Sequence, residues 1–249
     1  MLTLGVIPAR FDSTRFPGKP LVQILGKSMI RRVYEQVLQA NSIDKVVVAT
    51  DDERILNEIS SFGGNVIMTS KDHLSGTDRC FETLSLVGET YDVIVNIQGD
   101  EPFIHPQQIN QVAELLRNSK FEIATLARKI HEPNDLFNPN IVKVVFDKWG
   151  KAIYFSRHPI PYVRGIEEAK WTHHYDFYKH IGLYAYRTEV LAAITQLLPS
   201  SLEKSESLEQ LRWVENGYSI ALGITDKDNF GIDTPSDIEN LANLLKNSP

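Results

Sequence analysis

Three cationic side chains stand close together near the N-terminus. The stretch VIPARFDSTRFPGKPL places Arg10, Arg15 and Lys19 directly behind a short apolar run. Arginine can make two parallel hydrogen bonds to phosphate oxygens, and lysine supplies a compact positive charge. The stretch matches neither the P-loop pattern GxxxxGK[ST] nor the dinucleotide fingerprint GxGxxG, so side chains must help to hold a phosphate. The cluster predicts an anion site, against the alternative that each cation only pairs with a surface acid.

Acidic side chains follow two other strand-like runs. In VIVNIQGDEP, Gln98 and Asp100 come directly after an apolar run, and in NFGIDTP, Asp233 ends a second run just before a helix start. Two carboxylates that meet at one sheet edge could hold the hard cation that accompanies a triphosphate. The alternative is that these acids solvate a loop or cap a helix. Because no HxxxH, HExxH or CxxC spacing occurs, Mg²⁺ is favoured over zinc.

A third polar patch, TSKDHLSGTDR, follows a further apolar run. Ser75 and Gly76 are small enough to let a planar base approach the backbone, and Arg79 could read polar groups or orient its neighbours. The patch could equally be the N-cap of a helix. Both interpretations place it at the start of a helix.

Composition excludes several classes of function. The chain has 249 residues and a formal net charge of −6, which argues against a nucleic acid or an anionic membrane as the main partner. Cys80 is the only cysteine, so an internal disulfide is impossible, and the N-terminus lacks the pattern of a secretory signal. We expect a cytoplasmic protein that acts on small molecules. No apolar run approaches the length that spans a bilayer.

The first half alternates apolar runs with amphipathic stretches. LTLGVI, KVVVAT, NVIMT and YDVIVNIQ are short and rich in Val and Ile, as buried parallel strands are. Ser28 can cap one intervening helix, and Asp51 or Asp52 can cap the next. This rhythm predicts an α/β fold with a mostly parallel sheet, helices on both faces, and ligands at the carboxyl ends of the strands.

The second half is less regular. IVKVVFD and KAIYFSR flank a turn at residues 148–150 and predict an antiparallel pair, and GLYAYRT predicts a further strand. A helix is expected around Glu206 to Asn216, then a strand SIALGI and a last helix capped by Thr234. We expect one domain, 1–249, with an irregular portion around 150–190.

The motifs taken in order resemble one enzyme family. IPARFDSTRFPGKPL, SGTDR, VNIQGDEP, FNPNIVKVVFD, AIYFSRHPIP, HIGLYAYR and SLEQLRW look like the 3-deoxy-manno-octulosonate cytidylyltransferases, the CMP-Kdo synthetases of lipopolysaccharide assembly. The resemblance spans almost the whole chain, and it implies that the irregular portion around 150–190 serves sugar binding or dimerisation. It implies a Rossmann-like fold of the GT-A type, usually as a homodimer, that joins CTP and the sugar acid Kdo with Mg²⁺ to give CMP-Kdo and diphosphate.

The resemblance also assigns roles to matching positions. It implies that Asp100 and Asp233 bind the metal, and that the catalytic set is Arg10, Lys19, Asp100 and Asp233. The implied nucleotide-binding residues are Ala9, Arg10, Arg15, Lys19, Ser75, Gly76, Arg79 and Gln98. The implied sugar-binding residues are Gln98, Arg157, His180, Tyr184, Glu209 and Gln210. No general base is evident, so the sugar hydroxyl is expected to ionise with help from the metal and attack the α-phosphorus in line.

Two departures from the family pattern leave alternatives open. Phe11 stands where tyrosine is common, and the stretch around 165–178 matches no functional motif. The second departure leaves the choice among Kdo-like acids open, including 8-amino-Kdo. AIYFSR and SLEQLRW speak against a sialic-acid cytidylyltransferase. Intact Lys19, Asp100 and Asp233 speak against a non-catalytic sugar-nucleotide binding protein.

Overall fold

The contacts of the chain group into two compact units. The computed structural model describes residues 1–12, 16–228, 231–232 and 234–238. One unit comprises Met1–Asn110 with Asn229–Pro249, and the other comprises Gln111–Asp228. The expectation of a single domain over 1–249 stays a prediction.

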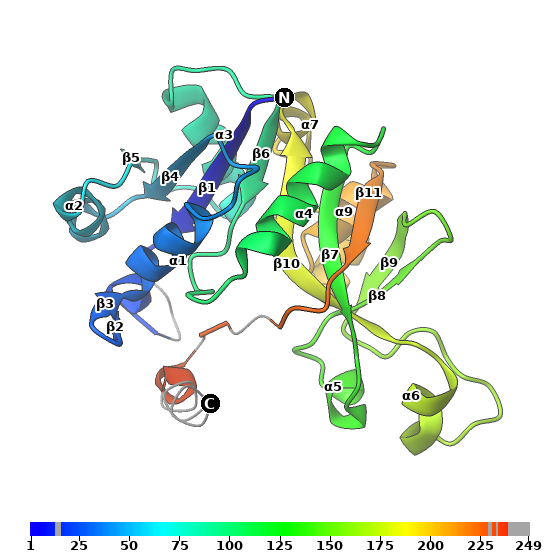
Figure 1. The fold of residues 1–249 in the computed structure, drawn as a ribbon. Helices are drawn as coiled ribbons and strands as arrows, with labels where there is room; N and C mark the ends of the chain where they lie inside the picture. The colour runs from blue at the N-terminus through cyan, green and yellow to red at the C-terminus, as the bar shows by residue number, and fades with distance from the viewer. Residues whose placement is uncertain (13–15, 229–230, 233, 239–249) are drawn as a thin grey trace. The chain divides into compact units, whose positions relative to one another are not determined.

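The first unit is built on a parallel sheet. Its strands run in the order β6 (Val93–Asn96), β1 (Thr3–Ala9), β4 (Lys45–Thr50) and β5 (Val66–Met68). Each neighbouring pair is parallel, and β1, β4 and β6 are almost wholly buried. The four apolar runs of the first half therefore form the parallel strands that the sequence predicts (Figure 1).

Capped helices cover both faces of this sheet. Ser28 accepts a hydrogen bond from the Arg31 amide at the start of α1 (Met29–Val37), and Asp52 caps α2 (Glu53–Ser61). Gly5 of β1 faces Val37 of α1, whereas Pro8 of the same strand faces the start of α3 (Gly76–Leu86). Residues 5 and 8 point to opposite faces of a strand, so α1 and α3 lie on opposite sides of β1 (Figure 1).

A short segment links β1 to α1. It contains a 3₁₀ turn η1 (Lys19–Leu21) and a small antiparallel hairpin of β2 (Gln23–Ile24) and β3 (Lys27–Ser28). Ile24 and Met29 pack with Ile232 in an apolar cluster. This packing ties the hairpin to the C-terminal part of the same unit.

The second unit centres on β7 (Ile123–Lys129). β11 (Ile220–Ile224) lies parallel to β7 on one side, and β10 (Tyr178–Arg187) lies antiparallel on the other, with a register shift between Ile181 and Tyr184. β8 (Lys143–Phe146) and β9 (Ala152–Ser156) form an antiparallel pair, and β8 also pairs with β10. The predicted antiparallel portion of the second half is confirmed.

The helices of the second half differ from the sequence prediction in one place. The sequence predicts one helix around Glu206 to Asn216, but the structure has α8 (Ser201–Glu206) and α9 (Gln210–Glu215). Ser207 adopts a left-handed backbone conformation, φ 52°, which ends α8 and turns the chain. The other helices are α4 (Pro106–Arg117), α5 (Pro133–Phe137), α6 (Trp171–His174) after the 3₁₀ turn η2 (Glu168–Lys170), and α7 (Thr188–Ile194).

The irregular segment between β9 and β10 has its own aromatic core. Trp171 is buried and stacks on Phe177 with ring centroids 6.1 Å apart. Tyr162 packs edge-on against Trp171, yet it is 73% exposed. The segment is therefore ordered around Trp171 and presents aromatic surface to solvent.

At the C-terminal end of the described chain, hydrogen bonds join Thr234 to Asp237, and the cap by the Thr234 hydroxyl stays a prediction. The Asp237 carboxylate accepts hydrogen bonds from the amide and the hydroxyl of Thr234. Among the described residues, no helix has both the length and the apolar character needed to cross a membrane.

Candidate active site

Lys19 and Asp100 form an ion pair. Lys19 follows β1 and Asp100 follows β6, so the two side chains come from the carboxyl ends of adjacent parallel strands. Lys19 Nζ lies 2.8 Å from Asp100 Oδ2, with 13% and 33% of the two side chains exposed. The sequence predicts one residue for a phosphate and the other for a metal, and the structure places them in direct contact.

The loop after β1 holds the other cations. Ala9 is buried as the last residue of β1, and Arg10 is exposed directly after it. Arg15 lies outside the described residues. Gly18 has φ +71°, a conformation that favours glycine, and its amide donates to the carbonyl of Phe11 at 2.9 Å. This bond closes the loop and sets the direction in which Lys19 leaves it.

The loop after β6 packs tightly on the end of β1. A Cβ atom on Gly99 would lie 2.7 Å from the carbonyl oxygen of Pro8, so only glycine fits there. Gly99 stands between Gln98 and Asp100, which are both partly exposed. The amide of Ile232 donates to the carbonyl of Asp100 at 3.0 Å. Asp233 itself lies outside the described residues.

The SGTDR patch forms the start of α3. Ser75 and Asp78 build a capping box, in which each side chain accepts a hydrogen bond from the other residue's amide. Gly76 is the first residue of the helix, and a Cβ there would make only ordinary contacts with Pro8 and Asn96, at 3.5 Å and beyond. The helix-cap interpretation is therefore confirmed, and a nucleotide contact at this helix start stays a prediction.

Arg79 is buried rather than presented to solvent. Its side chain is 1% exposed, one terminal nitrogen lies 2.7 Å from Asp51 Oδ2, and another donates to the hydroxyl of Thr69. Its guanidinium already has these protein partners. The geometry favours a supporting role for Arg79, and a direct contact with the nucleotide stays a prediction.

Four of the sugar-binding candidates lie in the second unit near one another. His180 and Tyr184 are both on β10, with ring centroids 5.3 Å apart. Tyr184 also packs edge-on against Trp213 of α9, the helix that begins at the predicted Gln210 and is preceded by Glu209. The structure thus brings together His180, Tyr184, Glu209 and Gln210 through β10 and α9.

His180 is a neutral imidazole in this arrangement. Burial removes its hydration and lowers the pKa of His180 to about 3. Its Nε2 lies 3.0 Å from the hydroxyl of Thr125, whose own proton is within reach of two backbone carbonyls of β10. Which of the two atoms donates depends on the tautomer of His180, and a neutral ring has one nitrogen that donates and one that accepts.

The hydroxyl of Tyr184 keeps its proton. Burial raises the pKa of Tyr184 well above its ordinary value, with a smaller contribution from the nearby Glu209 charge. Among the described residues, neither the Tyr184 hydroxyl nor Trp213 Nε1 has a hydrogen-bond partner, although both are buried. Buried donors of this kind are normally satisfied, so a partner for each of them is expected.

Arg157 is taken up by the protein backbone. Its guanidinium donates to the carbonyls of Glu206, Pro139 and Ser207 at 2.7, 3.0 and 3.2 Å. These bonds join the end of β9 to the α8–α9 junction. The structure therefore gives Arg157 a supporting place at the α8–α9 junction, and a direct contact with sugar stays a prediction.

A buried lysine lies next to Arg157. The ammonium group of Lys143 donates to the carbonyls of Asn138, Ile141 and Arg157 at 3.0, 2.6 and 2.5 Å. Burial lowers the pKa of Lys143, against the opposing effect of the Glu206 charge. Three carbonyl oxygens satisfy the three donors of an ammonium group, which makes its complete burial tolerable.

The donor chemistry of the first unit suits magnesium. Within the described ranges, no group of three or more His, Cys, Asp or Glu side chains gathers as a metal cage. Mg²⁺ does not require one, because it keeps several waters and binds one or two carboxylates together with substrate phosphates. The partly exposed Asp100 carboxylate fits this requirement, and Asp233 would be the second ligand.

The comparisons with known proteins agree with this geometry. Residues 4–220 match the family profile described as Cytidylyltransferase. The chain is 56% identical to the 3-deoxy-manno-octulosonate cytidylyltransferase of Parabacteroides distasonis and 54% identical to that of Bacteroides thetaiotaomicron, in both cases over 99% of each chain. The chain belongs to the 3-deoxy-manno-octulosonate cytidylyltransferase family.

Solved structures support the membership of this cytidylyltransferase family. A CMP:2-keto-3-deoxy-manno-octonic acid synthetase complexed with CTP superposes with a TM-score of 0.91 at 41% identity, over 99% of both chains. A 4-diphosphocytidyl-2C-methyl-D-erythritol synthase from Anaerococcus prevotii gives 0.64 at 15% identity, covering 98% of this chain and 96% of that chain, which shows a shared fold alone. The Rossmann-like, mostly parallel α/β fold is confirmed.

Sequence reasoning missed several residues around the site. Thr125 binds His180, while Asp51 binds Arg79, and Asp52 binds Arg54. One signal was present for the acids. Asp51 and Asp52 directly follow the apolar run KVVVAT, much as Asp100 follows the run VIVNIQ. No comparable signal marks Thr125, because its partners lie more than fifty residues away.

Proposed function

We propose that the protein transfers the cytidylyl group of CTP to Kdo and releases diphosphate. The observation that carries this proposal is the Lys19–Asp100 pair. A cation suited to bind phosphate and a carboxylate suited to bind a metal lie together at the carboxyl ends of two parallel strands. The family membership supplies the nucleotide and the sugar acid. The product, CMP-Kdo, would serve lipopolysaccharide assembly.

The reaction is a single in-line displacement. The anomeric hydroxyl of Kdo loses its proton to solvent and forms a bond to the α-phosphorus of CTP. The bond from that phosphorus to the bridging oxygen breaks, and its electron pair leaves with diphosphate. Arg10 and Lys19 stabilise the negative charge on the departing group. Asp100 and Asp233 would hold Mg²⁺, which when bound neutralises the phosphates and lowers the pKa of the attacking hydroxyl.

The second unit supplies groups that suit a sugar acid. The Tyr184 hydroxyl and Trp213 Nε1 are buried donors that a sugar hydroxyl can satisfy. The Nε2 atom of His180 binds the hydroxyl of Thr125, which leaves Nδ1 as the ring nitrogen that a sugar hydroxyl could contact. These groups, with Glu209 and Gln210, would fix the orientation of the sugar, and none of them has to transfer a proton.

A homodimer and a cytoplasmic location belong to the same proposal. The cytoplasm is where CTP is available as a substrate.

Tyr162, Tyr175 and Phe137 are exposed aromatic residues around the buried Trp171, and they offer apolar surface for a second copy. Sedimentation of the wild-type protein and of Tyr162→Ser tests the dimer, and an unchanged dimer in the variant would exclude this surface.

The first experiment measures diphosphate release with CTP and a sugar acid, with and without Mg²⁺. Kdo, 8-amino-Kdo and N-acetylneuraminate are compared, with Asp100→Asn as the variant and Asp92→Asn as a remote control. Release with Kdo that requires Mg²⁺ and is lost in Asp100→Asn supports the proposal. Release with another acid alone would overturn the sugar assignment, and binding of CTP without any release would indicate a binding protein.

A further inference from the structure

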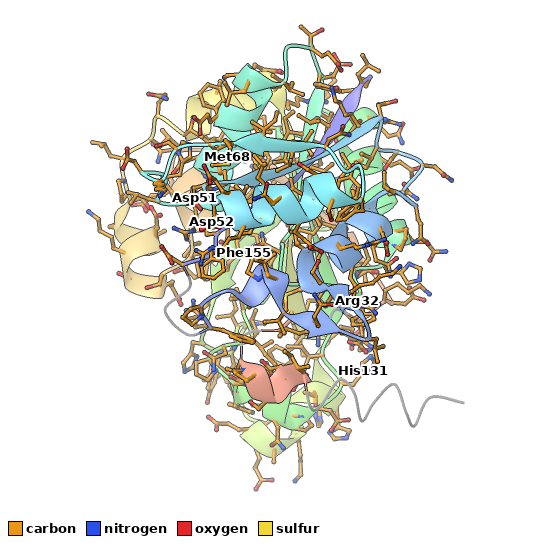
Figure 2. The ribbon with its side chains drawn as sticks, turned by 90° about the vertical axis from the view of Figure 1, so that its left-hand side faces the viewer. Arg32, Asp51, Asp52, Met68, His131 and Phe155 are labelled. Carbon is orange, nitrogen blue, oxygen red and sulfur yellow. The ribbon has the colours of Figure 1, made fainter. Side chains whose placement is uncertain are left out.

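We propose that Asp51 and Asp52, two consecutive acids at the end of β4, position the two loops that hold CTP. This inference rests on the proposed function, because it assigns supporting residues to the same nucleotide site. Figure 2 shows the two residues next to each other at the start of α2. Each carboxylate fixes one arginine, and each arginine reaches a different loop of the first unit.

Asp51, Arg79 and Thr69 form a chain of contacts, here called the Asp51 arm, that supports the loop between β5 and α3. Asp51 Oδ2 accepts from Arg79 at 2.7 Å, and Arg79 donates to the hydroxyl of Thr69, the first residue after β5. Thr69 in turn bonds through its amide and its hydroxyl to the carbonyl of Thr50, at 2.8 and 3.1 Å. The arm therefore joins the ends of β4 and β5 to the first turn of α3.

The same loop is held again further along. Glu82 of α3 accepts from the amide of Ser70 at 2.8 Å and contacts Nε2 of His73 at 2.5 Å. With the Ser75–Asp78 capping box, the loop is fixed at four points from residue 69 to residue 75. Asp51 and the Thr50 carbonyl support this loop from outside the loop and its own helix, so together they set where the loop stands relative to β4.

Asp52, Arg54 and Phe11 form a second chain of contacts, here called the Asp52 arm, that supports the loop after β1. Asp52 makes two parallel bonds to Arg54, from Nε at 2.9 Å and from a terminal nitrogen at 2.7 Å. The Arg54 guanidinium carbon lies 3.2 Å from the centroid of the Phe11 ring. Such a cation–π contact fixes the ring, since the guanidinium stacks on its face.

Phe11 transmits this support toward Lys19. The edge of the Phe11 ring lies 3.1 Å from where a Cβ of Gly18 would stand, and the amide of Gly18 binds the carbonyl of Phe11. Lys19 follows Gly18 directly and pairs with Asp100. The path from Asp52 to Lys19 therefore runs through Arg54, Phe11 and Gly18, with a contact at every step.

The ion pairs of the two arms differ in burial. Variants in the exposed pair can therefore test positioning of the loop without a large loss of protein stability. Asp51 and Arg79 are 13% and 1% exposed, so loss of one partner leaves a buried charge and destabilises the fold. Arg54 is 58% exposed, and an exposed pair contributes little to stability. Removing Arg54 should therefore leave folding intact and act on the loop alone. A displacement of about 1 Å at a reacting group can cost about a hundredfold in rate.

The simplest competing role is helix capping. Asp52 also accepts from the Arg54 amide as the N-cap of α2, at 2.9 Å. Asp52→Asn keeps a capping oxygen and loses the charge that binds the Arg54 side chain. Arg54→Gln leaves the cap untouched and removes the cation from Phe11, whereas Arg54→Lys keeps a cation. These three variants distinguish capping from positioning.

The experiment compares these variants with wild type in CTP affinity measured without sugar, KM for CTP, KM for Kdo, kcat and Tm. The matched control is Glu89→Gln, which breaks the surface pair with Lys45 at 2.8 Å in the same unit. We expect Arg54→Gln and Asp52→Asn to weaken CTP affinity about tenfold, with Kdo KM and Tm near wild type, and Arg54→Lys to recover part of the loss. Unchanged CTP affinity in Arg54→Gln would overturn the Asp52 arm.

The Asp51 arm needs a pair of variants because Asp51→Asn alone leaves Arg79 as an unpaired buried charge. Asp51→Asn with Arg79→Gln removes both charges. We expect the double variant to regain Tm over the single variant while CTP affinity stays about tenfold weaker. If Tm and CTP affinity recover together, Asp51 acts on stability alone and its positioning role is wrong.

The CTP affinity measured without sugar keeps the two proposals distinguishable. If wild type binds CTP but forms no CMP-sugar with any acid, the proposed function fails and the loops are still tested by affinity. If wild type forms product and the variants match it, the positioning proposal fails alone. If wild type binds no CTP, both fail.

Discussion

Lys19 Nζ lies 2.8 Å from Asp100 Oδ2. The residue proposed to bind the leaving diphosphate is therefore paired with the residue proposed to bind the metal. Before substrate arrives, each charge compensates the other, and the site avoids a lone partly buried charge. In the proposed complex with CTP and Mg²⁺, Lys19 would gain a phosphate and Asp100 a metal ion as new partners of opposite sign. The pair is therefore a resting arrangement that binding must open.

A first prediction follows from the competition between Lys19 and Mg²⁺ for the Asp100 carboxylate. Lys19→Met should strengthen Mg²⁺ binding to the substrate-free protein by roughly two- to fivefold, because Asp100 is released from a partly exposed pair worth about 0.2–1 kcal/mol. The same variant should lower kcat by roughly a hundredfold, since a cation at the leaving group is lost. Calorimetric Mg²⁺ titration and turnover measure the two effects. Lys27→Met, which breaks the pair with Glu35, is the control; equal Mg²⁺ affinity in all three proteins would exclude the competition.

A second prediction concerns two glycines at the proposed nucleotide site. Gly99→Ala should lower the free energy of unfolding by about 1–3 kcal/mol, because its Cβ would meet the Pro8 carbonyl at 2.7 Å. Gly76→Ala should leave stability unchanged or slightly raised, since its Cβ makes ordinary contacts at the first position of α3. Urea unfolding measures both. If Gly76 admits the nucleotide, its variant should still raise KM for CTP, and an unchanged KM would remove Gly76 from the pocket.

A third prediction separates support from binding at Arg157. Arg157→Lys should cost about 1–3 kcal/mol of stability through lost bonds to backbone carbonyls, and should change KM for Kdo less than about twofold. Arg187→Lys is a matched control, because Arg187 also binds three backbone carbonyls, those of Phe121, Leu116 and Ser119. A rise of tenfold or more in the Kdo KM of Arg157→Lys alone would show that Arg157 touches the sugar.

A fourth prediction concerns pH. The pKa of His180 is about 3 in the folded protein, against about 6.5 in an unfolded chain. Between these values the unfolded state binds the extra proton, so stability falls as pH is lowered from about 6.5, by up to about 1.4 kcal/mol per pH unit, and is fully present above that window. Urea unfolding of wild type and His180→Gln from pH 7.5 to 4.5 should show a steeper acid loss in wild type. Parallel pH curves for the two proteins would refute it.

The first unit was largely predictable from sequence because its signals are local. The strands read as short Val- and Ile-rich runs, and Ser28 and Asp52 cap helices that begin beside them. The position of Asp100 follows from the same pattern, since a residue after a parallel strand lies at the ligand edge. The contact of Lys19 with Asp100 is consistent with that expectation, although the pairing itself bridges 81 positions.

What the sequence could not supply depends on partners far along the chain. Arg79 and Arg157 look the same in sequence whether they face a ligand or the protein, and their acceptors at Asp51 and Ser207 lie 28 and 50 residues away. The break between α8 and α9 also lacks a local marker, because Ser207 takes a left-handed conformation without being glycine or asparagine. The places of Arg15 and Asp233 lie outside the described residues.

The ammonium group of Lys143, surrounded by three main-chain carbonyls, occupies the kind of oxygen cage in which some proteins keep a potassium ion. Here the ion is tethered to the chain. It can be neither washed out by dialysis nor exchanged for sodium, and no chelator removes it. The turn at residues 138–141 is thus organised from the moment of folding, and its geometry does not depend on the ionic composition of the cell.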